Sequence, residues 1–114
     1  MLESWKYLLP SEEPFIAWKG ANGKIIKLEI PNRDVCHYER GAMFYASCAK
    51  VLNIEEIDGR SSSIMSVASY EDPDFIYTVG KTVTPKNKTD KYAGIYFFTR
   101  RENAVNYVKR SEEQ

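Results

Sequence analysis

The dipeptide Asn22-Gly23 constrains the fold of this chain more than any other feature of its sequence. Asparagine and glycine best tolerate the positive φ angles of a type I′ turn, which joins two antiparallel strands directly. Segments with alternating apolar residues, 15–19 and 24–30, flank the dipeptide on both sides. We therefore predict a β-hairpin whose turn is formed by Asn22 and Gly23.

The turn also fixes the register of this hairpin, because opposed residues in antiparallel strands keep a constant sum of their positions. Trp18 should then oppose Lys27, and Ala21 should oppose Lys24. One face of the hairpin is apolar and should be buried, and it carries Phe15, Ala17, Ile26, Leu28 and Ile30. On the other face, Trp18 can lie against the Lys27 ammonium, and it either contacts a partner or covers a second small apolar cluster.

The rest of the chain predicts further strands, two helices and a long polar loop. Turn-forming residues separate the apolar segments, and Thr99 and Glu102 have the spacing of a capping box at the start of a helix. The expected elements are a short helix within 2–9, a surface loop at 32–41, strands at 48–57, 63–70, 75–79 and 92–98, a short edge strand at 82–84, and a helix from Thr99 onward.

These elements predict an α+β fold. We expect a mainly antiparallel, twisted sheet of about five to seven strands, with a C-terminal helix packed on it and a short helix at the N-terminus. A chain of 114 residues has the length of one domain, so residues 1–114 should fold as a single unit. That length buries enough apolar surface for a stable core without disulfides.

Charge is balanced in this chain, with 16 basic and 16 acidic side chains. A neutral chain lacks the electric field that draws proteins to duplex nucleic acid or to anionic membranes, so we expect neither as a partner. The N-terminal residues show no basic leader, and no segment is long enough to cross a bilayer. Cys36 and Cys48 suit free thiols in a reducing compartment, and we expect a cytoplasmic protein.

No catalytic motif is present in the sequence. His37 is the only histidine, so every histidine-dependent nucleophile would have to use it. Cys36 precedes it directly, but side chains at adjacent positions diverge, which makes an activated thiolate a poor interpretation. Glycine-rich phosphate loops and metal-ligand patterns are also missing. We therefore expect no enzymatic activity, no cofactor and no bound metal.

A strand that runs directly into a helix predicts an anion-binding site near the C-terminus. The first turn of a helix presents unpaired amide groups and partial positive charge, and two arginines stand there. Guanidinium groups grip phosphates, and aromatic rings stack on bases. The candidate ligand-binding residues are Arg100, Arg101, Tyr92, Tyr77, Lys81 and Lys91. Alternatively, the aromatic rings belong to the core and the lysines to a solvated loop.

Several segments resemble, in order and spacing, an uncharacterised domain that often follows pentapeptide repeats in phage and bacterial proteins. The resemblance covers residues 15–108, and the segments that carry it are 15–19, 26–31, 48–54, 77–81 and 94–98. That family tends to carry basic residues before the strand at Cys48, where this chain reads Phe44-Tyr45-Ala46-Ser47. The resemblance implies no settled activity.

Free-standing domains of this size also resemble small phage proteins that counter bacterial defence. One such group, the Thoeris anti-defence proteins, sequesters cyclic ADP-ribose signals as oligomeric sponges. This resemblance implies a phosphorylated nucleotide as ligand and a homo-oligomer as the assembled form.

A narrower resemblance is to the core of the poly(ADP-ribose) polymerases, where Gly-Ile-Tyr-Phe precedes Asn-Tyr. Residues 94–97 and the pair Asn106-Tyr107 reproduce that spacing. The polymerases also carry an earlier His-Gly pair for the nicotinamide cofactor, whereas Tyr38 follows His37 here. The resemblance therefore implies a degenerate ADP-ribosyltransferase-like domain without transferase activity.

We expect a non-catalytic, phage-type counter-defence protein that binds and sequesters a phosphorylated, cyclic nucleotide signal in the cytoplasm of a bacterial host. Two alternatives stay open. The first is a protein-interaction module that inhibits a bacterial defence protein, with the acidic segments 55–56 and 71–74 imitating nucleic acid. The second is the degenerate transferase-like domain.

Overall fold

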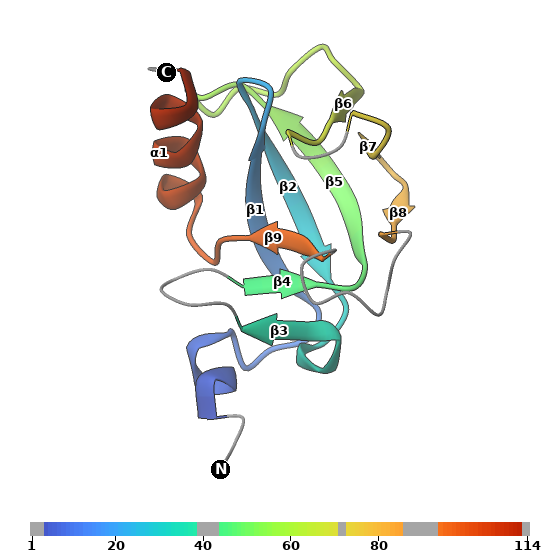
Figure 1. Cartoon of the computed structure of the whole chain (residues 1–114), viewed down its shortest axis with the longest axis vertical. Helices are drawn as coiled ribbons and strands as arrows, with labels where there is room; N and C mark the ends of the chain where they lie inside the picture. Colours follow the sequence, from blue (N-terminus) through green and yellow to red (C-terminus); the bar gives the residue numbers. More distant parts are fainter. Residues whose placement is uncertain (1–3, 39–43, 71–72, 86–93, 113–114) are drawn as a thin grey trace.

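In the computed structural model, which describes residues 4–38, 44–70, 73–85 and 94–112, antiparallel strands form three sheets (Figure 1). The predicted α+β class is confirmed. A four-stranded sheet has the order β1 (Phe15–Ala21), β2 (Lys24–Ile30), β5 (Ala49–Glu55), β8 (Thr82–Val83). A three-stranded sheet has the order β3 (Cys36–Tyr38), β4 (Phe44–Ala46), β9 (Ile95–Phe97), and β6 (Ser66–Ala68) pairs with β7 (Ile76–Thr78). Helix α1 (Arg101–Glu112) and two 3-10 helices, η1 (Ser4–Leu8) and η2 (Arg33–Val35), complete the described elements.

The hairpin β1–β2 has the register predicted from its turn. Trp18 opposes Lys27 and Ala21 opposes Lys24, and Asn22 and Gly23 have φ angles of 49° and 80°. The Lys27 ammonium lies 5.8 Å from the centroid of the Trp18 ring, as expected for a cation–π contact. All five apolar side chains of the predicted inner face are buried. The dipeptide therefore determined both the hairpin and its faces.

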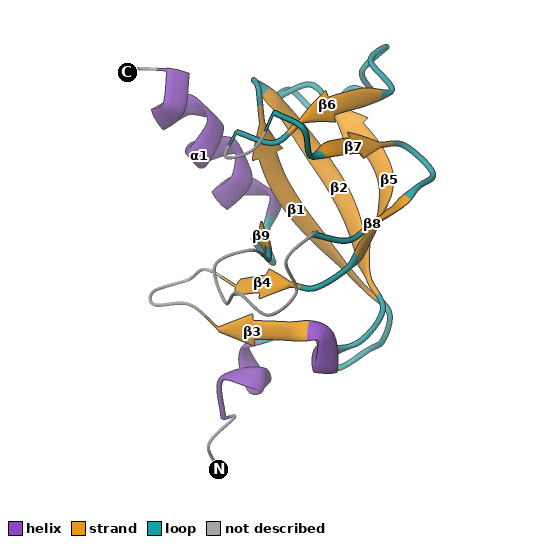
Figure 2. Cartoon of the chain, turned by 45° about the vertical axis from the view of Figure 1, so that its right-hand side comes forward, coloured by secondary structure: helices purple, strands orange, loops and turns teal. Residues whose placement is uncertain are grey.

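The two faces of the four-stranded sheet pack against different elements (Figure 2). The inner face joins the larger apolar cluster, to which the three-stranded sheet and β7 contribute. Helix α1 covers the upper part of the other face, where Ala104 and Val108 pack on Ile25. Trp18 lies against this second cluster, which confirms that it covers a small apolar group. A Cβ atom on Gly20 would lie 2.5 Å from Val108 Cγ2, so only glycine allows this close approach.

Helix α1 begins at Arg101, two residues after Thr99, the residue from which the sequence predicts the helix. Glu102 instead pairs with the Arg100 guanidinium, so the Glu102 carboxylate is engaged by a side chain just before the helix. The buried stripe agrees with the prediction, since Ala104 and Val108 are fully buried and Tyr107 is partly buried. The start of the helix was therefore placed too early, while its packing face was correct.

The three-stranded sheet contains two strands that the sequence pattern does not predict. The described part of the expected loop at 32–41 contains η2 and β3, so that loop prediction is wrong there. The Asn32 side chain accepts hydrogen bonds from the Asp34 and Val35 amides and thereby starts η2. Strands of three residues are too short to show alternation, and all three side chains of β4 are buried.

The remaining elements are shorter than predicted but lie where the sequence places them. The expected N-terminal helix is the 3-10 helix η1, and β6 and β7 are three-residue strands within the predicted 63–70 and 75–79. Strand β8 is the edge of its sheet, as expected. No helix in the described ranges is both long enough and apolar enough to cross a membrane.

Candidate functional site

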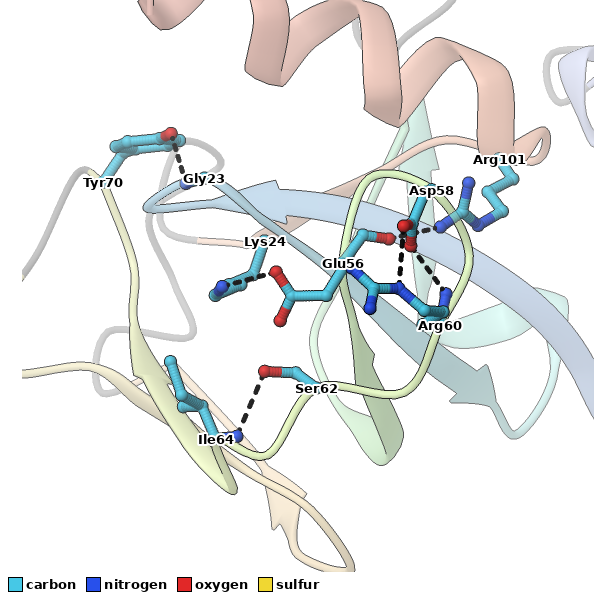
Figure 3. A network of polar contacts seen from close by, with 9 residues as sticks. All are labelled: Gly23, Lys24, Glu56, Asp58, Arg60, Ser62, Ile64, Tyr70 and Arg101. Atoms are coloured by element: carbon cyan, nitrogen blue, oxygen red, sulfur yellow. Dashed lines mark hydrogen bonds and ion pairs between the residues drawn. The ribbon is translucent and has the colours of Figure 1, made fainter.

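The Arg101 side chain, a candidate phosphate ligand, is held by the protein itself (Figure 3). Its Nε donates to Glu55 Oε1 at 3.0 Å, its Nη1 to the Ile57 carbonyl at 3.2 Å and its Nη2 to the Glu56 carbonyl at 2.8 Å. Its guanidinium carbon also lies 5.8 Å from the centroid of the Trp18 ring. A phosphate at this guanidinium would have to displace these contacts, so Arg101 ties the start of α1 to the end of β5.

The turn that follows β5 carries further ion pairs around Arg101 (Figure 3). Lys24 Nζ donates to Glu56 Oε1 at 2.7 Å, and this bond lowers the pKa of Glu56 below its usual value. The Arg60 backbone N–H donates to Asp58 Oδ1 at 3.1 Å and likewise lowers the pKa of Asp58. We call Lys24, Glu55, Glu56 and Arg101 the junction network. Its charges neutralise one another in pairs.

Arg100 and Lys81 are the two described candidates whose side chains are exposed, and they do not converge. The Arg100 side chain is 71% exposed and pairs with Glu102. It lies near β1, because Phe98 forms a bridge with Trp18, whereas Lys81 leads into β8. Strands β1 and β8 are the opposite edges of a four-stranded sheet, about 14 Å apart at the usual strand spacing. The two cations therefore cannot grip one small anion together.

Tyr77 belongs to the core, with 2% of its surface exposed. Its ring packs beside Phe75 at 5.1 Å between centroids, and the Lys19 ammonium lies 6.0 Å from the Tyr77 centroid. A base could not stack on this ring without opening the core. The other two candidates, Tyr92 and Lys91, lie outside the described residues.

Among the described residues, the large apolar side chains with the highest exposed fractions lie at the other end of the molecule, on η1. Tyr7 is 88% exposed and Leu8 is 61% exposed. Trp5 anchors this helix, because its ring stacks on Tyr38 at 6.1 Å and packs on Phe44 at 6.3 Å between centroids. We call Trp5, Tyr7, Leu8 and Tyr38 the N-terminal aromatic surface.

The geometry of a 3-10 helix explains how Trp5, Leu8 and Tyr38 come to share one side. Residues three apart eclipse each other, so Leu8 lies above Trp5, and Tyr38 extends the same side through its stack on Trp5. Tyr7 is a third of a turn away and flanks Leu8 on the neighbouring side of η1. Lys6 also holds η1 in place, since Lys6 Nζ lies 3.4 Å from Asp34 Oδ1. An apolar surface with a polar neighbour is the usual make-up of a protein contact.

The sequence does contain a signal for this surface, although it was not recognised. Trp5, Tyr7, Leu8 and Leu9 fall within five residues, directly before Pro10. One short turn of helix cannot bury so many large side chains, and of these four only Leu9 is buried. Such an excess of apolar residues over available contacts is typical of surfaces that bind a partner.

Cys36 and His37, the pair that looks reactive in the sequence, take part in packing. Burial raises the pKa of Cys36 to about 12, and its Sγ lies 3.6 Å from the Asn32 carbonyl oxygen. The thiolate, which is the nucleophilic form, is therefore scarce near neutral pH. His37 points to the other side of β3 and stacks on Tyr45 at 5.2 Å between centroids. The two side chains do not form a catalytic pair.

The fold and these surfaces define an antiparallel α+β domain with a neutralised polar junction and an exposed aromatic surface. The chain belongs to a family described as "Family of unknown function (DUF5758)", which it matches over residues 5–104. That range contains both the junction network and the N-terminal aromatic surface. No curated protein and no solved structure matches this chain.

Proposed function

We propose that this domain is a non-catalytic protein-interaction module whose partner binds the N-terminal aromatic surface. The observation that carries the proposal is the exposure of Tyr7 and Leu8, at 88% and 61%, beside the anchored ring of Trp5. Protein interfaces are typically centred on a few aromatic and aliphatic side chains that fill pockets of the partner.

The anchoring of this surface favours tight binding. Trp5 is held by two rings, and Lys6 by Asp34, so η1 is already arranged before a partner arrives. Binding then orders few additional side chains, which keeps the entropic cost of association low. The acidic groups of the junction network are paired with cations of the same chain, so they give little support to imitation of nucleic acid.

The resemblance to phage counter-defence proteins suggests a bacterial defence protein as partner, met in the cytoplasm of the host. In longer chains, the resemblance to domains that follow pentapeptide repeats suggests the same docking role beside such repeats. In both cases the partner would offer an apolar pocket to Leu8 and Tyr7.

Site-specific photo-crosslinking tests this proposal. A photoreactive phenylalanine analogue at position 7, in protein produced in a bacterial host, should give one discrete crosslinked product, and the same analogue at position 100 should not. With the purified partner, Leu8→Ser should weaken binding about tenfold or more, and Arg100→Ala should leave it unchanged. A crosslink at position 100 alone, or a partner insensitive to Leu8→Ser, would contradict the proposal.

A second candidate function is sequestration of a phosphorylated, cyclic nucleotide by an oligomer. Its support is the exposure of Arg100 directly before the first turn of α1, where a phosphate would meet both the guanidinium and the helix dipole. Calorimetry with cyclic nucleotides and ADP-ribose derivatives tests it, and Arg100→Ala should abolish binding while Tyr7→Ser does not. Affinities weaker than millimolar for the whole panel would exclude this function.

The third alternative, a degenerate transferase-like domain, has a simple test. Incubation with NAD should release no nicotinamide. Measurable turnover would overturn the non-catalytic proposal and return attention to residues 94–107.

A further inference from the structure

The hairpin formed by β6 and β7 carries a second exposed apolar surface, separate from the N-terminal one. Ile64, Met65 and Ile76 are 43%, 58% and 44% exposed. Ile64 and Met65 lie just before β6, where the Val79 amide still donates to the Met65 carbonyl at 2.9 Å. We call the following set, whose members alternate along the two strands on one side, the ribbon surface: Ile64, Ser66, Ala68, Ile76 and Thr78.

The two sides of this hairpin differ, because side chains alternate along a strand. Val67 opposes Tyr77, and both pack into the larger apolar cluster. Ser66 opposes Thr78 and Ala68 opposes Ile76, and these four side chains therefore lie on the other side. The hairpin is anchored by one side and presents the other to solvent (Figure 2).

The ribbon surface is also uncharged. No charged residue occurs within 61–70 or within 75–80. Natural proteins usually protect exposed strands with lysine or other charges, and interfaces with a foreign partner use complementary charges to select it. The surface itself offers no such selection, and it brings no like charges face to face with an identical copy, because the nearest acidic residues in the sequence belong to the connection 71–74 between the two strands. We propose that the ribbon surface binds a second copy of this chain.

The pattern along the ribbon surface suits pairing with itself. One end carries Ala68 and Ile76, the other end carries Ile64, and the Ser66 and Thr78 hydroxyls lie between them, 3.1 Å apart. In an antiparallel, face-to-face pair related by a two-fold axis, each apolar end covers the opposite end of the partner. The hydroxyl pairs then meet at the axis, where they can bond to one another.

The outer edge of β6 argues for contact through faces and against strand addition. At one end of this strand the Asn22 side chain donates to the Ala68 carbonyl at 2.8 Å. At the other end the Ile64 amide donates to Ser62 Oγ at 3.0 Å. These bonds occupy backbone groups that a pairing strand would need, so the two copies meet through side chains.

Sedimentation equilibrium over a wide range of protein concentration tests this inference. The wild-type chain should show a concentration-dependent dimer. Ile76→Lys and Ile64→Lys, which are two independent variants at exposed positions, should each raise the dissociation constant about tenfold or more, because the two-fold axis places each charge in the interface twice. Tyr7→Lys adds the same charge to the N-terminal aromatic surface and should leave the dimer unchanged.

Each result decides the question. Circular dichroism spectra that match the wild type confirm that the variants are folded. A wild-type chain that stays monomeric at the highest concentration, or a dimer that survives both ribbon variants, overturns the inference. Loss of the dimer in Tyr7→Lys also overturns it, because the dimer would then use the other surface. The measurement needs no partner protein, so its failure is distinct from failure of the proposed function.

Discussion

The junction network and the N-terminal aromatic surface differ in how far the protein has already used their side chains. At the junction, Arg101 has three hydrogen-bond partners within the chain, and Lys24 has Glu56. At the N-terminus, Tyr7 and Leu8 extend from η1 with most of their surface in solvent. The charged side chains of the first region are bonded to groups of the same chain, whereas the apolar side chains of the second region are exposed to solvent.

This difference teaches that charge in a sequence is a weak guide to binding. An arginine at the start of a helix is drawn to an external phosphate and equally to a carboxylate and carbonyls at the end of a neighbouring strand. The turn after β5 supplies those acceptors to Arg101. Exposed apolar side chains have no comparable partner within the chain. Burying them would stabilise the folded state, but this fold keeps them exposed to solvent.

The largest expected effect is the loss of the Arg101 contacts. Arg101→Ala should lower the free energy of unfolding by about 3 kcal/mol, because it leaves Glu55 partly buried without its cation. Urea denaturation measures the loss. Arg101→Lys is the matched control and should recover part of it, because an ammonium can pair with Glu55 but cannot reach all three acceptors. An unchanged urea midpoint in Arg101→Ala would show that the Arg101 contacts do not stabilise the fold.

A smaller effect is expected when the anchor of the aromatic surface is removed. Trp5→Ala should cost about 2 kcal/mol, less than for a fully buried tryptophan, because Trp5 packs on Tyr38 and Phe44 but is only partly buried. Thermal unfolding gives this value. Equal stability of Trp5→Ala and wild type would mean that η1 is not held against β3, and the surface would lose its preformed shape.

The stability of the junction network and of the neighbouring Asp58–Arg60 turn should also depend on pH. The pKa values of Glu56 and Asp58 are lowered in the folded chain by Lys24 and by the Arg60 backbone amide, respectively. Their contribution to stability is therefore present above the unfolded pKa values and is lost as the pH falls through the folded ones, below about pH 4. Unfolding midpoints at neutral and acid pH should show this loss, and Lys24→Met should make it smaller. The opposite change would contradict the Lys24–Glu56 pairing.

The smallest effect on stability is expected at the open surface. The double variant Tyr7→Ser, Leu8→Ser should change the free energy of unfolding by less than about 0.5 kcal/mol, because both side chains are mostly exposed. Urea denaturation measures it, with Trp5→Ala as the destabilising reference. A loss as large as that of Trp5→Ala would reveal packing that the structure does not show and would weaken the proposed docking role.

The parts of the fold that the sequence predicts are those fixed by local rules. Asn22-Gly23 determined a turn, and the turn determined the partners of Trp18 and Ala21. The edge position of β8 followed from Pro85, which comes directly after the predicted strand, and the buried stripe of α1 followed from the spacing of its apolar residues. Strands β3 and β4 did not, because three residues show no period and their burial depends on β9, which lies far away in the sequence.

The candidate site was harder to predict for a related reason. Whether Arg101 faces a ligand or the protein depends on where the chain turns after β5, and the sequence near Arg101 contains no information about that turn. Tyr77 looked like a stacking platform because aromatic residues alternate on its strand, yet the same alternation places it in the core. Exposure is decided by tertiary packing, so residue type alone could not separate ligand contacts from core contacts.

Gly20 allows β1 and α1 to pack closely, because it has no side chain. Because no side chain at this position separates the strand from Val108, the backbone of β1 itself limits how closely α1 can approach the sheet. The same helix carries Arg101 at its start, so we expect a change in packing at Gly20 to move Arg101 relative to Glu55 as well, although the two contacts lie at different turns of the helix. The absence of a Cβ atom at Gly20 therefore bears on the position of α1, and through α1 on the position of Arg101 in the junction network.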